Sequence, residues 1–395
     1  MRAARTLLFA GTVVSLAACA DQGASPVATA DRTAPVLSAG DASRAVEGQY
    51  IVVLNEGANP RSVAAVAGIS PKYVYTAALN GFAGTLNAGQ LNALRHNPNV
   101  AYIEQDQEVS VAATQTGATW GLDRTDQRNL PLSTSFTYLN TGLGVNAYII
   151  DTGIRFDHVD FGGRASTGYD AVTPGGTAAD CQGHGTHVAG TVGGLTWGIA
   201  KAVTLKAVRV LDCSGSGTNA GVAAGMDWVT ANHVKPAVAN MSLGGGASTA
   251  IDDATRRMIA AGVATTIAAG NGNMAGRAQD ACNYSPARVA EGITVGATTS
   301  TDAKASYSNY GTCLDIFAPG SSITSASHSS TTGSKVLSGT SMAAPHVAGV
   351  AALYLQSNPT ATAQQVRDAL VNDATLNKVT SAGNGSPNRL LFTAY

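Results

Sequence analysis

From about residue 113 onward, short unbroken apolar runs alternate with longer stretches in which apolar residues recur at helical spacing. Two of these helical stretches cover residues 218–233 and 249–261. Unbroken apolar runs of this length are typical of parallel strands that are buried on both faces of a sheet. The pattern therefore predicts an α/β domain with a mostly parallel central sheet between helices. The predicted strands are residues 145–150, 205–210, 238–241, 263–268 and 293–295.

Residues 48–112 follow a different order: strand, helix, two strands, helix, strand. Asn80-Gly81 marks a turn between strands, and Asn59-Pro60 opens the first helix. This order predicts a small α+β, ferredoxin-like domain, which contains no nucleophile and base of its own. The expected elements are a strand at 49–54, a helix at 60–67, a strand at 82–86, a helix at 90–95 and a strand at 100–103.

The first 20 residues are expected to be an export signal, because Arg2 and Arg5 precede an apolar run at 7–18. Leu-Ala-Ala-Cys at 16–19 is similar to a bacterial lipoprotein cleavage box, in which Cys19 would carry the lipid. Ala-Cys-Ala at 18–20 also fits an ordinary cleavage site, so both alternatives stay open. In either case the chain is expected to leave the cytoplasm. Residues 21–47, which are rich in Ala, Ser and Pro, are expected to be a flexible linker.

Composition limits the classes of function. Only 12% of the 395 residues are charged and the formal net charge is −1, so the chain lacks the basic surface that nucleic-acid binding needs. A chain of this length suits one large and one small domain.

The strongest chemical signal is Gly-Thr-Ser-Met-Ala-Ala-Pro-His-Val-Ala-Gly at 339–349, which runs into an apolar helical pattern. Ser341 is therefore expected in the first turn of a buried helix, where the helix dipole favours negative charge. An isolated serine at this position usually caps the helix. It can instead be a nucleophile if a base lies nearby.

Three further stretches can supply the partners of such a serine. Asp151 ends a predicted strand and can orient a histidine. His184 and His187 lie three residues apart at the start of a helix, and either can act as the base. Asn271 follows another strand and can donate a hydrogen bond to an oxyanion. In a parallel sheet, the carboxyl ends of the strands meet at one edge, so these side chains can converge.

Together these stretches resemble the subtilisin-like serine peptidases, over nearly the whole chain from residue 120 onward. Asp-Thr-Gly at 151–153, His-Gly-Thr-His-Val-Ala-Gly at 184–190 and the serine motif occur in the family's order. The chain is most similar to the proteinase K branch and its aqualysin subgroup, through the motifs at 120–124, 240–246, 283–287 and 308–311. The resemblance implies a three-layer domain, and a triad of Asp151, His184 and Ser341 with Asn271 in the oxyanion hole. His187 and His346 would be structural.

The resemblance also implies where substrate binds. The family pairs an extended peptide with an edge segment, and its primary pocket follows a buried strand. No charged residue occurs in either segment, so broad cleavage after apolar or aromatic residues is expected. The implied residues are Ser242, Leu243, Gly244 and Gly245 in the edge segment, and Ala268 and Gly270 in the pocket.

Apart from Cys19, four cysteines remain, and they allow three pairings. The resemblance implies that Cys181 pairs with Cys213, and Cys282 with Cys313. A competing interpretation takes Cys181, His184 and His187 as zinc ligands. That reading leaves the aspartate, asparagine and serine motifs unexplained.

Structural calcium is the expected cofactor, because hard cations prefer several oxygen ligands. One site resembles a calcium loop of the aqualysin subgroup, with Ser133 and Ser135 nearby. A second resembles a proteinase K site, built from one carboxylate and two backbone carbonyls. The residues implied are Asp123, Asp126 and Gln127 for the first site, and Asp315 with Ala290 and Gly292 for the second.

The resemblance identifies residues 48–112 as an inhibitor-type propeptide, and residues 113–395 as the catalytic domain. We expect a secreted, monomeric endopeptidase, made as a zymogen that cuts itself between Ser110 and Thr114. A lipase is disfavoured, because its serine would lie in Gly-x-Ser-x-Gly and its triad would follow another order. A catalytically silent protein that keeps this fold as a binding or inhibitor protein is the remaining alternative.

Overall fold

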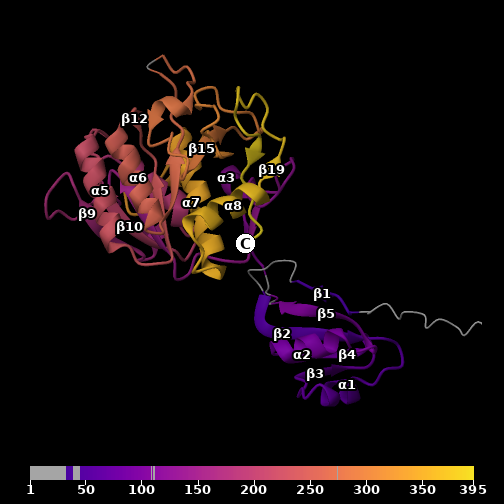
Figure 1. Cartoon of the computed structure of the whole chain (residues 1–395). Coiled ribbons are helices and arrows are strands. Elements are labelled where there is room, and N and C mark those ends of the chain that lie inside the picture. Colours follow the sequence, from indigo (N-terminus) through magenta and orange to yellow (C-terminus); the bar gives the residue numbers. More distant parts are fainter. Residues whose placement is uncertain (1–32, 39–44, 108, 110–111, 274) are drawn as a thin grey trace, which may run out of the picture. The chain divides into compact units, whose positions relative to one another are not determined.

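The computed structural model describes residues 33–38, 45–107, 109, 112–273 and 275–395. The chain divides into two compact units, at 1–108 and 109–395. Each unit is described by itself (Figure 1). Among the described residues, no helix has both the length and the apolar character needed to cross a membrane.

The smaller unit is a five-stranded sheet with two helices. Its strand order is β1-β5-β2-β4-β3, and β2 pairs antiparallel with both β4 and β5. Phe82, Leu94 and Ile103 are fully buried in its core. The predicted strand, helix, two strands, helix and strand are confirmed. They are β2 (Ala45–Leu54), α1 (Pro60–Val66), β3 (Tyr73–Tyr75), β4 (Gly81–Thr85), α2 (Ala88–Arg95) and β5 (Val100–Gln107).

The flexible linker expected at 21–47 is wrong for part of its length. Strand β1 (Val36–Leu37) pairs in parallel with β5, and the buried Ala34 donates its N–H to the carbonyl of Arg95. Strand β2 also begins at Ala45, before the predicted domain boundary. The sequence offered no periodic pattern here, because a two-residue strand at a sheet edge is too short to show one.

The larger unit is built on a nine-stranded sheet with the order β19-β20-β16-β15-β13-β11-β8-β10-β9. All neighbouring strands pair in parallel except β19 and β20, which confirms the predicted parallel sheet. The strands are β8 (Asn146–Asp151), β9 (Ala165–Asp170), β10 (Thr204–Arg209), β11 (Ala237–Met241), β13 (Ala264–Ala268), β15 (Ile293–Thr298), β16 (Ile316–Pro319), β19 (Thr375–Leu376) and β20 (Arg389–Leu390).

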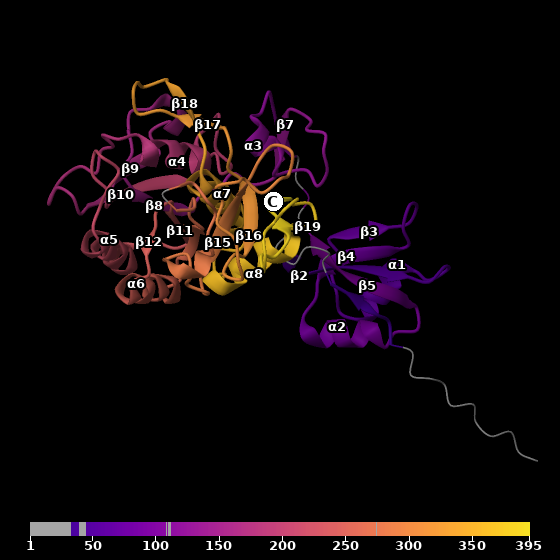
Figure 2. The same cartoon turned by 90° about the horizontal axis from the view of Figure 1, so that it is seen from above.

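The helices form the outer layers of this three-layer domain (Figure 2). The apolar run at 145–150 is unbroken because successive side chains of β8 point to opposite faces of the sheet and both faces are buried. Ala147 and Ile149 join the core formed with α4 (His184–Gly193) and α7 (Thr340–Ser357). Tyr148 and Ile150 join the core formed with the other two helices. Those helices are α5 (Asn219–Asn232) and α6 (Thr249–Ala260), and α8 (Ala363–Asp373) packs against α7.

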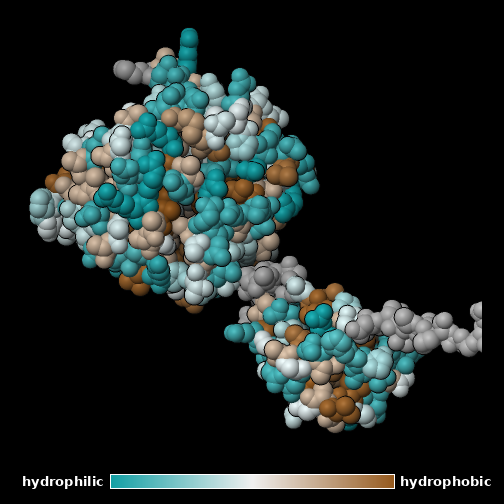
Figure 3. All heavy atoms as spheres, viewed as in Figure 1, coloured by the Kyte–Doolittle hydropathy of each residue, from teal (hydrophilic) through white to brown (hydrophobic). Residues whose placement is uncertain are grey.

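On the face that Figure 3 shows, hydrophilic and weakly hydrophobic residues are interspersed, and strongly hydrophobic residues are scattered.

Short paired segments complete the larger unit. The remaining elements are β6 (Ala113–Thr116) with β7 (Ser135–Tyr138), α3 (Trp120–Asp123), β12 (Gly245–Gly246) with β14 (Tyr284–Ser285), β17 (Ile323–Ala326) with β18 (Ser334–Leu337), and the 3-10 turns Val159–Phe161 and Ala281–Asn283.

Candidate active site

Ser341 is the second residue of α7, as predicted, and this helix is almost entirely buried. The Oγ of Ser341 donates a hydrogen bond of 3.2 Å to the carbonyl of Ser242, whose own Oγ donates to the carbonyl of Ser341. The nucleophile candidate is therefore fixed against the segment that follows β11. The N-terminus of α7 adds the positive end of its dipole at the same point.

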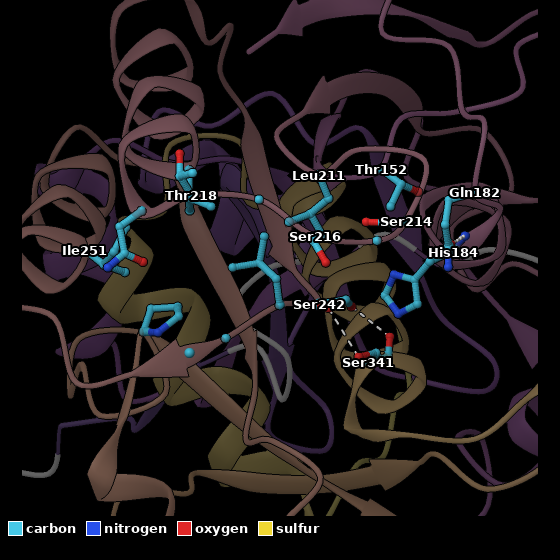
Figure 4. Close-up of a pocket in the computed structure, with 18 of the residues that line it drawn as sticks. Thr152, Gln182, His184, Leu211, Ser214, Ser216, Thr218, Ser242, Ile251 and Ser341 are labelled. Atoms are coloured by element: carbon cyan, nitrogen blue, oxygen red, sulfur yellow. Dashed lines mark hydrogen bonds between the residues drawn. The ribbon is translucent and has the colours of Figure 1, made fainter. Parts of the chain in front are cut away.

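Asp151 and His184 form a hydrogen-bonded pair. Asp151 ends β8 and is completely buried, while His184 is the first residue of α4. The Nδ1 of His184 lies 2.8 Å from Oδ1 and 3.0 Å from Oδ2 of Asp151. The carboxylate thus fixes the ring and favours the tautomer with the proton on Nδ1. In Figure 4, the His184 ring and Ser341 lie side by side in one pocket.

The pKa of His184 lies above its ordinary value. Burial of the ring opposes protonation and is the largest influence, but the negative charges of Asp151 and Asp180, with the Asp151 hydrogen bond, outweigh it. Lys335 acts in the opposite direction. This balance stabilises the imidazolium that forms when a histidine accepts the proton of a serine.

The other two histidines near the motifs are buried among backbone groups. The Nε2 of His187 lies 3.0 Å from the carbonyl of Ile323, and the Nδ1 of His346 lies 2.8 Å from the carbonyl of Met342. Burial lowers the pKa of each to about 4. Both rings are therefore neutral and tied to structural partners. The residues alone did not distinguish His187 from His184.

Asn271 follows β13, beside the start of α7. Its Oδ1 accepts hydrogen bonds from the N–H of Thr340 at 2.8 Å and the Oγ of Thr340 at 3.0 Å. These two hydrogen bonds fix the orientation of the Asn271 side-chain amide. The contact of Thr340 with Asn271 was not predicted from the sequence. The only signal for it was the position of Thr340 directly before Ser341.

A groove of about 540 Å³ passes the His184 and Ser341 side chains. Residues 214–219 form one rim, and the predicted edge residues Ser242, Leu243, Gly244 and Gly245 line it as well. A second pocket of about 260 Å³ opens beside Ser341 and contains the predicted Ala268 and Gly270. The structure thus brings together every substrate residue proposed from the sequence.

Both implied disulfides are present. Cys181 is bonded to Cys213, and Cys282 to Cys313. Because Cys181 is in a disulfide, it has no thiolate to offer a metal, and the zinc interpretation is wrong. Within the described residues, no group of three or more His, Cys, Asp or Glu side chains could hold a metal ion.

The first calcium candidate has an unusual buried carboxylate. Oδ1 of Asp126 is buried without a hydrogen-bond partner among the described residues, while Oδ2 accepts from Thr137 N–H at 2.7 Å. Burial, and then the nearby charge of Asp123, raise the pKa of Asp126 to about 6. Ser133 donates from N and Oγ to Asp123. Both oxygens of Asp123 already accept hydrogen bonds, so the feature that fits a hard cation is the orphaned, buried Oδ1 of Asp126.

At the second calcium candidate, the carboxylate of Asp315 already has protein partners. Oδ2 of Asp315 accepts a hydrogen bond from Thr294 N–H at 2.8 Å, and Oδ1 is paired with Arg367 of α8. Both oxygens of Asp315 therefore have partners. Ala290 and Gly292 precede β15, the strand that pairs with β16.

Comparison with known proteins defines the class. Residues 142–391 match the Subtilase family, and residues 49–112 match Peptidase inhibitor I9. The first match alone covers more than half of the chain, and the fold and site described above agree with it. The chain therefore belongs to the subtilase family of serine proteases, and it carries an I9 propeptide domain before the subtilase domain.

Several individual proteases are similar to this chain over much of its length. The chain is 55% identical to the "Extracellular serine proteinase" of Thermus sp. (strain Rt41A), with 98% of each chain covered. It is 54% identical to the "Alkaline serine exoprotease A" of Vibrio alginolyticus, over 82% of this chain and 60% of that protein. A solved structure of a cold-adapted subtilisin-like serine proteinase matches with a TM-score of 0.68 and 54% identity. That match covers 71% of this chain and all of the other.

Proposed function

We propose that this chain is a secreted serine endopeptidase whose nucleophile is Ser341. The observation that carries the proposal is the hydrogen bond from the buried Asp151 to His184, because His184 and Ser341 line the same groove. In this scheme, His184 accepts the Ser341 proton while the serine oxygen attacks a peptide carbonyl. His184 then donates the proton to the leaving amine, and water releases the acyl group from Ser341.

Asn271 stabilises the oxyanion in this proposal. Thr340 holds the Oδ1 of Asn271, so the Nδ2–H group can donate to the substrate oxygen together with the N–H of Ser341. Donors that are already oriented cost little reorganisation when charge develops.

The substrate is proposed to be an extended peptide that pairs with Ser242–Gly245 through backbone hydrogen bonds. The second pocket would receive the side chain before the cut bond. No residue that lines this pocket carries a charge, which favours apolar and aromatic side chains. Broad specificity follows, because such a pocket selects mainly by size.

Residues 48–112 are proposed to act as an intramolecular inhibitor that is removed by self-cleavage between 110 and 114. The I9 match over residues 49–112 supports the first part. Residues 110 and 111 of the cleavage segment lie outside the described residues, as do the signal at 1–20 and the candidate lipid site Cys19. A relative named as extracellular and matched over almost its full length supports export. The lipid on Cys19 and the monomeric state stay predictions.

A structural calcium ion is proposed at Asp123, Asp126 and Gln127. The orphaned, buried Oδ1 of Asp126 supports this site, because a cation would neutralise the two close carboxylates. The ion would stabilise the end of α3 and the residues that follow it, and would take no part in the reaction. At Asp315, a cation would have to compete with Arg367, so we rank that site second.

The test compares intact masses and peptide hydrolysis of wild-type protein and Ser341→Ala. The proposal predicts a wild-type fragment that begins near residue 113 and hydrolyses a chromogenic peptide. Ser341→Ala should stay joined to residues 48–112 and be inactive. If both proteins are processed alike and neither hydrolyses peptides, the catalytically silent binding protein becomes the better account.

A further inference from the structure

Asn271 is followed directly by Gly272, so the oxyanion candidate lies in an Asn-Gly pair. Asn-Gly pairs are prone to deamidation, because glycine has no Cβ to hinder attack by its own backbone nitrogen on the asparagine side chain. Gly272 cannot readily be replaced at this position. Its φ is +82°, and an added Cβ would lie 2.5 Å from the carbonyl of Arg277. The fold therefore keeps a chemically vulnerable pair at the centre of its site.

The side chain of Asn309 binds the backbone on both sides of Asn271. Asn309 is 1% exposed. Its Oδ1 accepts the N–H of Gly272 at 3.0 Å and that of Gln279 at 2.8 Å. Its Nδ2 donates to the carbonyl of Ala269 at 2.8 Å, and its own N–H donates to the carbonyl of Gly270. The side chain of Asn309 thus holds Ala269 and Gly272, and its backbone N–H holds Gly270, on the two sides of the oxyanion candidate.

The contacts of Asn271 itself increase its vulnerability. Two donors of Thr340 bind Oδ1 of Asn271 and draw electron density from its Cγ, which makes Cγ a better electrophile. Protection must then come from the nucleophile, the nitrogen of Gly272. That nitrogen carries the hydrogen bonded to Asn309, so its proton is held and its direction is fixed.

We propose that Asn271 is a latent deamidation site and that Asn309 protects it by holding the N–H of Gly272. In the reaction, the deprotonated nitrogen of Gly272 attacks Cγ of Asn271 and forms a C–N bond. The Cγ–Nδ2 bond breaks and ammonia leaves with the proton, which gives a succinimide. Water then opens the ring to aspartate or isoaspartate. No other reactant is needed.

The modification itself does not depend on catalysis. Its consequence for activity rests on the proposed function, because a carboxylate at 271 would repel the oxyanion where an amide donates to it. The test is therefore done in Ser341→Ala protein, which also prevents self-digestion under that proposal. A change in mass at residue 271 can be found whether or not the chain is a peptidase.

The chain contains its own reference for an unprotected pair. Asn384 and Gly385 are both exposed, in the turn before β20. Samples of Ser341→Ala, with and without Asn309→Ala, are kept at mildly alkaline pH and digested at intervals. Peptide mass spectrometry then follows conversion of amide to acid at residues 271 and 384 in the same molecules.

With Asn309 present, residue 384 should be converted while residue 271 stays intact. Asn309→Ala should raise conversion at residue 271 at least about tenfold, the factor that corresponds to ~1.4 kcal/mol for the hydrogen bond lost. Two results would overturn the proposal. Residue 271 could be converted as fast as residue 384 with Asn309 in place, or it could stay intact in Asn309→Ala while residue 384 is converted.

Two control variants separate protection from general loosening. Asn309→Asp keeps an oxygen acceptor for Gly272 N–H, so it should protect residue 271. Ser308→Ala removes the hydroxyl that accepts Ala297 N–H and donates to the carbonyl of Asn309, in the same turn, but leaves the Gly272 contact. It should destabilise the fold without converting residue 271. Conversion in Ser308→Ala equal to that in Asn309→Ala would contradict the proposal.

One measurement needs no substitution at 309. Hydrogen exchange of the Gly272 amide in Ser341→Ala should be much slower than that of the exposed Gly385 amide, because exchange needs the same N–H to be released. Equal exchange rates at the two glycines would refute protection even if Asn309→Ala failed to fold.

Discussion

The two disulfides close loops of nearly equal length, but they lie differently with respect to His184, the proposed base. Cys181 comes directly before Gln182, whose Oε1 accepts the N–H of His184 at 2.8 Å. Its partner, Cys213, leads into the groove rim at residues 214–219. Cys282 and Cys313 connect a 3-10 turn to the segment before β16. Removing each bond should therefore have similar effects on stability and different effects on activity.

The expected loss of stability follows from the loop lengths. The sequence separations are 32 residues for Cys181–Cys213 and 31 for Cys282–Cys313. In the chain-entropy relation, closing loops of this length removes about 3.7 kcal/mol of unfolded-chain entropy in each case. Each pair of Cys→Ser substitutions should thus lower the free energy of unfolding by ~3.7 kcal/mol.

The assay is guanidinium unfolding of Cys181→Ser/Cys213→Ser and Cys282→Ser/Cys313→Ser, each in Ser341→Ala protein. The same two double variants, with Ser341 intact, are assayed for peptide hydrolysis at a temperature well below that of unfolding, which gives their kcat/KM values. Loss of the first bond should reduce kcat/KM more than loss of the second, because it frees both Gln182 and the groove rim. The reasoning is refuted if the second loss reduces kcat/KM as much as the first, or if either bond can be removed without loss of stability.

Three further predictions concern the site. Asn271→Ala should lower kcat by ~100- to 1000-fold with little change in KM, measured in steady-state hydrolysis; an unchanged kcat would remove Asn271 from the oxyanion hole. Because the pKa of His184 is raised and its neutral form is the base, activity should fall as the pH drops through that pKa. Asp180→Asn removes a negative charge that raises the pKa of His184, so the acid limb of the kcat/KM profile should move to lower pH. A move to higher pH would contradict this assignment. Chelation of calcium should lower the melting temperature of Ser341→Ala, and in Asp126→Asn that temperature should respond much less to calcium; an equal response would exclude the Asp126 site.

The parts of the fold that sequence predicts well are those with long local patterns. The alternation of residues 147–150 between two cores produces the unbroken apolar run that predicted β8. Helix α7 and the position of Ser341 within it were predicted because the small residues and the helical pattern are contiguous. In contrast, β1 adds two residues to a sheet edge, and pairing of that kind depends on β5, which is far away in the chain.

The site shows the same limit. Asp151, His184 and Ser341 lie in motifs with fixed neighbours, so sequence resemblance could select them. Asp180 could not be selected, although its carboxylate accepts hydrogen bonds from Thr152, Thr186 and the backbone before α4. Asn309 occurs in a recognisable motif, but its contact with Gly272 spans 37 residues. Such roles depend on tertiary contacts between residues far apart in the chain, which local sequence patterns do not predict.

The central claim, that Ser341 is a nucleophile activated by His184, can be tested directly with a fluorophosphonate, which phosphonylates activated serines. Mature wild-type protein is treated with the reagent, digested and mapped by mass spectrometry. We predict one stoichiometric adduct on Ser341, with labelling abolished in Ser341→Ala and greatly slowed in His184→Ala. Labelling of a different serine, or labelling of Ser341 at the same rate without His184, would contradict this account of the site.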